Sequence, residues 1–343
     1  MSFLKNTFYL IDSSRKVYLA SHKNRPLQKY VTASTLDVTA KARAMSDDTI
    51  SEDLFAKFRW YMTNTLFFGQ MLTDLTGIER TEKEDKAYMY LGTIIAFTDL
   101  LIDDYKVDEE SMRTILSDVF LESESRNVTG LLIEDLFRLY LNAFYDHFDR
   151  SNINEFKRCL VGLMTAQIDS ARQFNPDISE KEIIRITSEK GGYSFELCCN
   201  IYPKLKGKVT AAMYKIGVID QFLNDAQDIH KDLKSGIKTF AHFKNDFADI
   251  SNTLIQHRDE AFQAVMSLDL PFKNKEKFLF GFNAIVSGVI YKTHCYSKVM
   301  NNDLDFSKMA KLPKSDFDIP VFNLNSFKFN FPKIVGFDAK KYL

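Results

Sequence analysis

The chain has 343 residues, of which 45% are hydrophobic and 27% are charged, and its formal net charge is −1. This balance is ordinary for a folded globular protein and argues against a disordered chain. Because neither sign of charge is in excess, the composition gives no reason to expect binding to nucleic acid or to an acidic membrane surface.

The N-terminal segment, Met1–Leu10, is apolar in places but has neither a basic region nor a small-residue cleavage site, so we predict no secretory signal. No apolar run reaches the roughly 18 residues that a membrane span needs, so no transmembrane segment is expected. The cysteines show no Cys-x-x-Cys spacing, and we interpret them as reduced, mostly buried thiols. They are Cys159, Cys198, Cys199 and Cys295. Together these features predict a cytoplasmic protein.

Helix breakers are few. The chain has 13 Gly and 7 Pro against 30 Phe and 15 Tyr, and no proline lies between Pro26 and Pro176. Apolar residues recur at helical spacing almost throughout, which predicts an all-α fold. The aromatic residues suggest either a large aromatic-lined interior or simply a Phe-rich core. The expected helices lie near residues 54–66, 88–104, 110–122, 129–149, 152–174, 180–203, 208–233, 237–267 and 273–301.

Two local signals mark the boundary between the fifth and sixth of these helices. The Asn-Pro-Asp run at 175–177 ends the first, and Ser179 with Glu182 fits a capping box that opens the second. Residues 302–343 carry three prolines among scattered phenylalanines, and we predict an irregular tail packed on the helices. The simplest organisation is one domain over residues 1–343.

A first acidic cluster stands at the end of the second expected helix. Asp99 and Asp103 are four residues apart on one helix face, Asp104 lies about 100° further round, and Asp108 follows. Like charges at this spacing repel each other, and a helix C-terminus disfavours anions. A hard cation such as Mg²⁺ reverses both penalties and often bridges to phosphate. The alternative is a solvated helix end, with Asp108 as the N-cap of the next helix.

A second acidic cluster lies in the helix expected at 208–233. Asn224, Asp228 and Asp232 step by four residues, and Gln221 falls within the same arc of about 80°. Three oxygen-donating side chains along one face can chelate a hard cation, and Lys231 beside them can meet an anionic ligand. The alternative is a polar helix face with lysine pairs, which leaves Asn224 and Asp228 unexplained.

The sequence Lys190-Gly191-Gly192 lies between the two clusters, inside a helical pattern. A Gly-Gly pair permits a break or kink in the helix, beside which Lys190 would bind phosphate as a point charge. It equally suits a tight helix crossing that requires small residues. Arg172 and Arg185 are further basic candidates for diphosphate contact, although no local motif places them.

The order of acidic helix, Lys-Gly-Gly and second Asn/Asp-rich helix resembles the class I isoprenoid (terpene) synthase superfamily, most clearly from Gly92 to Phe240. The Asn224–Asp228–Asp232 spacing resembles the metal triad of terpene cyclases, with Asp at both later positions. From Gln221 onward, the same stretch resembles the second motif of squalene and phytoene synthases.

Other features of the resemblance are mixed. The first cluster, Asp99-x-x-x-Asp103-Asp104, is closer to the squalene and phytoene form than to Asp-Asp-x-x-Asp. Residues 232–239 resemble the end of the motif of chain-elongating prenyl diphosphate synthases.

The resemblance implies a class I terpenoid synthase bundle of helices around a central apolar cavity, and dimers are common in this superfamily, so a homodimer is possible. It implies Mg²⁺ as cofactor and a prenyl diphosphate as substrate. The implied metal ligands are Asp99, Asp103, Asp104, Asn224, Asp228 and Asp232. The implied catalytic residues are Asp99, Asp103 and Asp228, and the diphosphate-binding residues are Lys190, Lys231 and Arg185.

The function expected first is that of a terpene synthase, which ionises one allylic prenyl diphosphate. Chain elongation is less favoured, because the sequence lacks the Gly-Lys-Arg and Arg-Arg elements that bind a second diphosphate in that family. Head-to-head condensation stays open, as does a non-catalytic lipid-binding scaffold. A di-iron protein is excluded, because none of the six histidines has Glu three positions before it.

Overall fold

The computed structural model describes residues 33–35, 37–38, 40–41, 52–121, 127–202, 205, 207–319 and 324–343. Over these ranges the regular structure is helical and contains no strand, which confirms the all-α prediction. The described residues divide into two compact units. The N-terminal unit holds the described residues up to Ile168 and the described residues within Leu197–Lys206. The C-terminal unit holds Asp169–Glu196 and the described residues within Gly207–Leu343. One domain over residues 1–343 stays a prediction.

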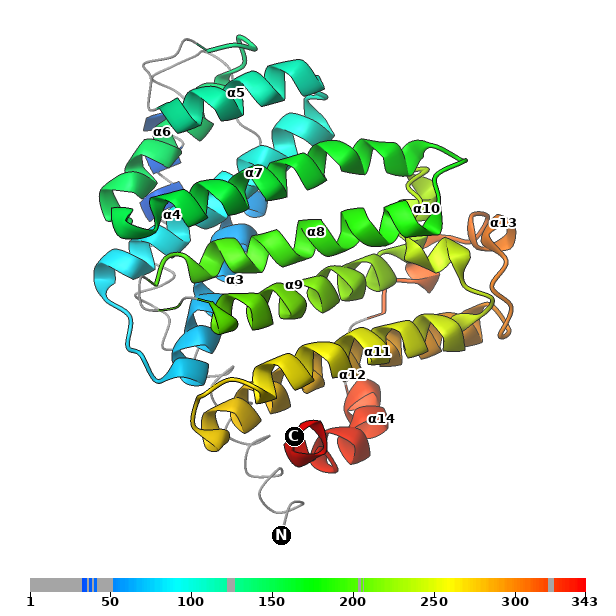
Figure 1. Cartoon of the computed structure of the whole chain (residues 1–343). Helices are drawn as coiled ribbons and strands as arrows, with labels where there is room; N and C mark the ends of the chain where they lie inside the picture. The colour runs from blue at the N-terminus through cyan, green and yellow to red at the C-terminus, as the bar shows by residue number, and fades with distance from the viewer. Residues whose placement is uncertain are drawn as a thin grey trace. The chain divides into compact units, whose positions relative to one another are not determined.

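The N-terminal unit is built around α4, which packs against α3 on one side and α6 on another (Figure 1). Residues on all sides of α4 are buried from Ala87 to Asp99 apart from Tyr90, which explains its weak amphipathic pattern. Thr81 and Glu84 form a capping box that begins this helix. The helices of this part of the chain are α3 (Glu52–Thr76), α4 (Glu82–Asp99), α5 (Glu109–Leu121), α6 (Leu132–His147) and α7 (Ile153–Ser170).

The C-terminal unit is built around α11, which packs against both α9 and α12 (Figure 1). The helix α14 packs on α12. The Ser179 hydroxyl accepts the Glu182 amide, as the capping pattern predicted. The helices are α8 (Glu180–Cys199), α9 (Lys208–Gln227), α10 (Ile229–Lys234), α11 (Phe247–Met266), α12 (Phe272–Val299), α13 (Phe306–Met309) and α14 (Leu324–Val335).

Two of the expected helices in the C-terminal unit are interrupted. The helix predicted at 208–233 is divided at Asp228 into α9 and α10. The one predicted at 237–267 begins only at Phe247, because Asp246 accepts the Asp249 amide as its N-cap and a separate short turn precedes it. Apolar periodicity continues across both interruptions, so it does not reveal them.

The C-terminal segment 302–343 is more ordered than predicted, since it contains α13, α14 and a final short turn, Ala339–Tyr342. The Phe329 ring on α14 stacks on His294 of α12, with 5.0 Å between the ring centroids. Pro332 lies in the last turn of this helix, which continues past it to Val335 although proline cannot donate a hydrogen bond to the preceding turn. We attribute the order of this segment to aromatic packing, whereas the prediction of an irregular tail was based on its proline content.

The Lys190-Gly191-Gly192 sequence does not break α8, which continues through both glycines. A Cβ built on Gly191 would lie 2.2 Å from the carbonyl oxygen of Gly217 on α9, and one on Gly217 would lie 2.2 Å from that of Gly191. The two helix backbones are therefore in direct contact. The tight-crossing interpretation is confirmed, and the predicted break is absent.

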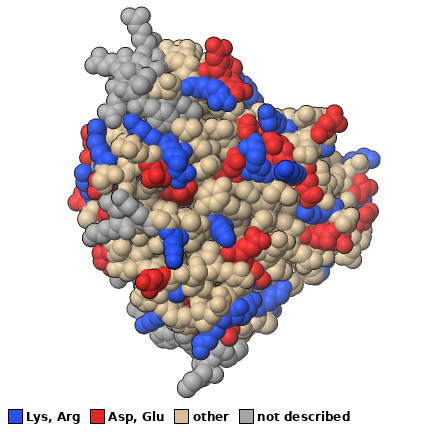
Figure 2. All heavy atoms as spheres, viewed as in Figure 1, with Lys and Arg blue, Asp and Glu red and all other residues tan. Residues whose placement is uncertain are grey.

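Surface and thiol features agree with the composition. The described helices include none long and apolar enough to cross a membrane. The four cysteines are free thiols, buried except for the half-buried Cys295, as expected. Basic and acidic side chains are interspersed over the face drawn in Figure 2.

Gly191→Ala tests the helix crossing. The added methyl group has no space, so we expect the free energy of unfolding to fall by about 1–3 kcal/mol. Gly281→Ala is the matched control, because a Cβ there meets no atom within 4 Å. It should raise the free energy of unfolding by up to about 1 kcal/mol through helix propensity. Urea titration measures both, and equal effects of the two substitutions would contradict the crossing.

Candidate functional site

The second acidic cluster lies at the junction between α9 and α10. Asp228 is the junction residue, with φ −98° and ψ 8°. Its amide still donates to the Asn224 carbonyl at 3.0 Å, and its own carbonyl accepts the Asp232 amide at 2.8 Å. Hydrogen bonding therefore continues across the junction, and the acidic residues stay within about two helical turns of one another.

Asp225 is the carboxylate that the sequence reasoning missed. Its side chain is only 6% exposed, and it accepts hydrogen bonds from Thr187 Oγ1 of α8 at 3.1 Å and from Gln221 Nε2 at 2.9 Å. Asn224, the predicted ligand, is exposed instead. The available signal was the spacing 221, 225, 228 and 232, since steps of four, three and four follow one helix face.

Electrostatics connect the carboxylates of this cluster. Burial raises the pKa of Asp225 to about 6, although the hydrogen bonds from Gln221 and Thr187 oppose the shift. Burial, together with the neighbouring charges of Asp225 and Asp228, raises the pKa of Asp232 to about 7. A bound cation would relieve both the desolvation and the mutual repulsion.

The predicted basic residues stand in different relations to this cluster. Lys190 of α8 lowers the pKa of both Asp225 and Asp232, so its charge is felt at the carboxylates. Lys231 is largely exposed and forms an ion pair with Asp228, with 2.9 Å between Nζ and Oδ2. An anion bound to the cluster would therefore be attracted by the positive charge of both lysines.

Arg185 is engaged elsewhere. Its guanidinium pairs with Asp169, Glu182 and Glu189, at 2.5, 2.9 and 2.5 Å respectively. These hydrogen bonds, first those with Glu182 and Asp169, raise its pKa. Its role in diphosphate binding stays a prediction, and diphosphate would have to replace at least one of these carboxylates.

The first acidic cluster departs from the expected helix geometry. Asp99, the last residue of α4, is buried, and its two oxygens accept hydrogen bonds from the Tyr61 hydroxyl and the Gln167 amide. The next five residues, Leu100–Asp104, form a π-helix rather than the α-helix that was predicted through Asp104. A π-helix has more residues per turn, so the α-helical alignment of Asp99 with Asp103 does not apply. The side chain of Asp103 lies outside the described part of the structure.

The remaining residues of this cluster have local partners. Asp104 is exposed and pairs with Lys57 at 3.2 Å. Asp108 accepts the Ser111 amide at 2.9 Å and the Ser111 hydroxyl at 2.7 Å, and the amide bond is the first of the contacts that lower its pKa. Asp108 is therefore the N-cap of α5, as the alternative interpretation held. Metal binding by Asp104 stays a prediction.

The donor chemistry suits magnesium, but the arrangement is not a closed cage. Among the side chains that the structure describes, no group of three His, Cys, Asp or Glu residues is arranged to hold a metal ion. The second cluster instead offers carboxylate and amide oxygens, which are the donors that Mg²⁺ prefers. Mg²⁺ is commonly bound through one or two carboxylates together with waters and substrate phosphates. This donor set therefore fits Mg²⁺ that arrives with a phosphorylated ligand.

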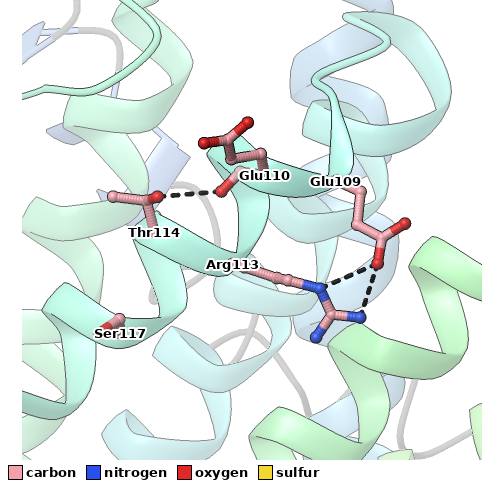
Figure 3. Close-up of a pocket in the computed structure, with 5 residues that line it drawn as sticks. All are labelled: Glu109, Glu110, Arg113, Thr114 and Ser117. Atoms are coloured by element: carbon pink, nitrogen blue, oxygen red, sulfur yellow. Dashed lines mark hydrogen bonds and ion pairs between the residues drawn. The ribbon is translucent and has the colours of Figure 1, made fainter.

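Two surface hollows are defined by described residues, and neither is the predicted apolar cavity. Figure 3 shows the larger, an open hollow of about 570 Å³ along α5 where Arg113 pairs with Glu109. The other measures about 420 Å³. Their linings are polar or charged: Glu109, Glu110, Arg113, Thr114 and Ser117 in the first, and Glu82, Lys83, Lys86, Asp146 and His147 in the second. The apolar cavity stays a prediction.

Comparison with known proteins yields only distant likenesses. No family model and no curated protein matches the chain. Similar solved structures include a geranyltransferase from Legionella pneumophila, 11% identical with a TM-score of 0.42, and a geranyltranstransferase from Thermotoga maritima, 13% identical with a TM-score of 0.43. Each comparison covers 76% of this chain and 98% of the other. At such identities and TM-scores, the likeness does not place the chain in a family.

The pH dependence of stability tests the buried carboxylates. Since the pKa of Asp232 rises from the usual 3.8 to about 7, the folded chain holds this proton more tightly than the unfolded chain does. Its contribution to stability therefore falls as the pH rises from about 4 to about 7. Asp232→Asn removes this charge, so we expect its stability relative to wild type to increase over that range, on the order of 1 kcal/mol after solvent screening.

Urea titrations of both proteins at several pH values, without metal, measure this difference. The difference between variant and wild type is the quantity that matters, because half-buried His242 and His257 have lowered pKa values and change stability with pH in the opposite direction. A difference that is independent of pH would contradict the burial and repulsion assigned to Asp232.

Proposed function

We propose that the chain is a Mg²⁺-dependent class I terpene synthase, which ionises an allylic prenyl diphosphate, releases diphosphate and forms a linear or cyclic terpene. The observation that carries this proposal is the cluster of carboxylates Asp225, Asp228 and Asp232 around the α9–α10 junction, where the charge of Lys190 on α8 acts on Asp225 and Asp232. Burial gives Asp225 and Asp232 raised pKa values, so the cluster is unfavourable without a cation. Sites with strongly shifted carboxylates are candidates for function.

In this proposal, one or two of the carboxylates of Asp225, Asp228 and Asp232 bind the metal, and waters and diphosphate oxygens complete its coordination. Mg²⁺ supplies charge neutralisation for the departing diphosphate. Gln221 and Thr187 fix the orientation of the Asp225 carboxylate by hydrogen bonds, so it needs no reorganisation when charge develops. The residues of the first cluster, Asp99, Asp103 and Asp104, are proposed as further metal ligands, and so is Asn224, whose side chain is exposed.

The basic residues have the complementary role. Lys190 acts on Asp225 and Asp232 from α8, and Lys231 lies beside Asp228, so both can stabilise a phosphate bound to the metal. The substrate is proposed to be a prenyl diphosphate, whose allylic cation requires an apolar pocket with aromatic faces once the diphosphate has left.

A condensing prenyltransferase is the second candidate. The spacing of Asp99, Asp103 and Asp104 favours head-to-head condensation, whereas chain elongation lacks its usual basic elements in this sequence. A non-catalytic lipid-binding scaffold is a third candidate, and it differs from both enzymes in lacking metal-dependent turnover.

A turnover assay separates these functions. The purified chain is incubated with geranyl, farnesyl or geranylgeranyl diphosphate, with Mg²⁺ or with EDTA, and with or without isopentenyl diphosphate. Released diphosphate is measured, and products are identified by gas chromatography. We expect Mg²⁺-dependent release and a terpene from a single allylic substrate. Product formation only with isopentenyl diphosphate would indicate elongation, and a condensed product of two allylic units would indicate head-to-head coupling.

The scaffold function has its own signature in the same experiment. It predicts no turnover of any of the three substrates, together with no change in melting temperature when Mg²⁺ and inorganic diphosphate are added. That combined result would contradict the proposed enzyme.

Asp228→Ala tests the site itself. Because Asp228 is the central carboxylate of the cluster and partly exposed, we expect turnover to fall by about 100-fold or more while the chain stays folded. Asp108→Ala is the matched control, since Asp108 caps α5 and is proposed to have no catalytic role. Steady-state rates and far-ultraviolet circular dichroism measure the two effects. Wild-type rates in Asp228→Ala would refute the assignment.

A further inference from the structure

A lysine on α12, which no motif marked, lies next to the α9–α10 junction. Lys292 precedes Tyr296 by one helical turn, and its Nζ lies 5.7 Å from the centre of that ring. The Tyr296 hydroxyl donates to the carbonyl of Gln227 at 2.7 Å. Gln227 is the last residue of α9, immediately before Asp228. Tyr296 therefore fixes this turn of α12 against the second acidic cluster.

Lys292 has no ion pair within the described part of the chain, although it is half-buried. Burial lowers its pKa, and the charges of Asp228 and Asp318 oppose that shift without either carboxylate forming a salt bridge with it. Its ammonium lies over the Tyr296 ring, but a partly desolvated charge without an anionic partner is still unfavourable. An anion bound between Lys292 and the cluster would supply the missing partner.

Asp318 is held close by aromatic packing of the C-terminal segment. The preceding residue, Phe317, stacks on His230 of α10, with ring centroids 4.3 Å apart and planes 10° apart. Its carbonyl oxygen also accepts the Tyr296 hydroxyl at 3.2 Å. The segment is thus attached at the same junction, and its exposed Asp318 carboxylate is near enough for its charge to act on Lys292.

We propose that Lys292 binds the diphosphate group at the second acidic cluster, and that Asp318 competes with this ligand for the lysine. This inference rests on the proposed function, because the cluster must hold a Mg²⁺-bound diphosphate. The carboxylates bind the ligand through the metal, and Lys292 contacts its oxygens directly as a point charge. A ligand of higher negative charge gains more from this lysine, so Lys292 favours diphosphate over monophosphate.

Calorimetric titration with inorganic diphosphate, in the presence of MgCl₂, tests the proposal without requiring turnover. We expect Lys292→Met to weaken diphosphate binding by about tenfold or more, since a charge-assisted contact is lost. Lys298→Met is the matched control on the same helix, because that lysine is exposed. It should bind within about twofold of wild type, as expected for a surface charge. Asp318→Asn should strengthen binding by a few-fold, because the competing charge is removed.

Melting temperatures without ligand show whether the variants fold. Met matches the shape of the lysine side chain and removes a half-buried charge that has no ion pair, so Lys292→Met should be at least as stable as wild type. Lys292→Gln provides a second neutral variant for which the same loss of binding is expected.

The outcomes separate this inference from the function on which it rests. No binding of Mg²⁺ and diphosphate by wild type would contradict the proposed function and this inference together. Wild-type binding that is unchanged in Lys292→Met and Lys292→Gln would overturn the inference alone. Equal weakening by Lys298→Met would show a general charge effect and would overturn it as well. Unchanged affinity in Asp318→Asn would overturn the competition.

Discussion

The contact between Gly191 of α8 and Gly217 of α9 determines how the second acidic cluster is built. Two helices in backbone contact hold their neighbouring side chains closer together than helices separated by large residues do. One helical turn before Gly191, the Thr187 hydroxyl reaches the Asp225 carboxylate. The charge of Lys190, the residue next to Gly191, acts on both Asp225 and Asp232. Without this crossing, the buried carboxylate of Asp225 would lose the partners on α8 that make its burial tolerable.

The second acidic cluster is energetically unfavourable when no ligand is bound. Burial is the largest cause of the raised pKa values of Asp225 and Asp232, and repulsion between the carboxylates adds to it. A sequence selected only for stability would not be expected to gather acidic residues at a helix junction in this way. The cost is understandable if a cation and an anion occupy the site during function, since their binding free energy then offsets the repulsion.

Much of the fold could be predicted from the sequence, because long helices with few breakers show a regular apolar period. The ranges of α5, α8 and α12 follow that period closely. The π-helix at Leu100–Asp104 could not be predicted, since its hydrogen bonds depend on tertiary packing rather than on a distinct pattern. The order of the C-terminal segment was also hidden, because it depends on ring stacking between Phe residues and histidines far away in the chain.

The sequence singled out Asn224, Asp228 and Asp232 but not the buried Asp225, for a geometric reason. Successive steps of four residues rotate about 40° each, so Asn224, Asp228 and Asp232 drift about 80° around the helix. The steps of four, three and four residues from Gln221 through Asp225 and Asp228 to Asp232 have rotations that nearly cancel. On an ideal helix, Asp232 is therefore rotated only about 20° from Gln221. The set that runs from Gln221 to Asp232 therefore follows one face of the helix more closely than the set from Asn224 does, and it includes the buried Asp225. Lys292 was beyond reach of any spacing argument, because about 60 residues separate it from Asp232 and only the packing of α12 on α9 brings it to the junction.

The arrangement of donors also limits how a metal can be bound. A closed set of three or more carboxylates would hold a divalent cation without any other ligand, but no such set occurs among the described side chains. The carboxylates of the second cluster instead follow one face of α9 and α10. The positive charges of Lys190 and Lys292 nearby disfavour the binding of a cation that carries no anion with it. An anion between the lysines and the metal removes that opposition, because it is attracted to both. Metal and anion should therefore bind as a pair, each weakly without the other, which is the behaviour that a diphosphate-ionising site requires and that a structural metal site would not show.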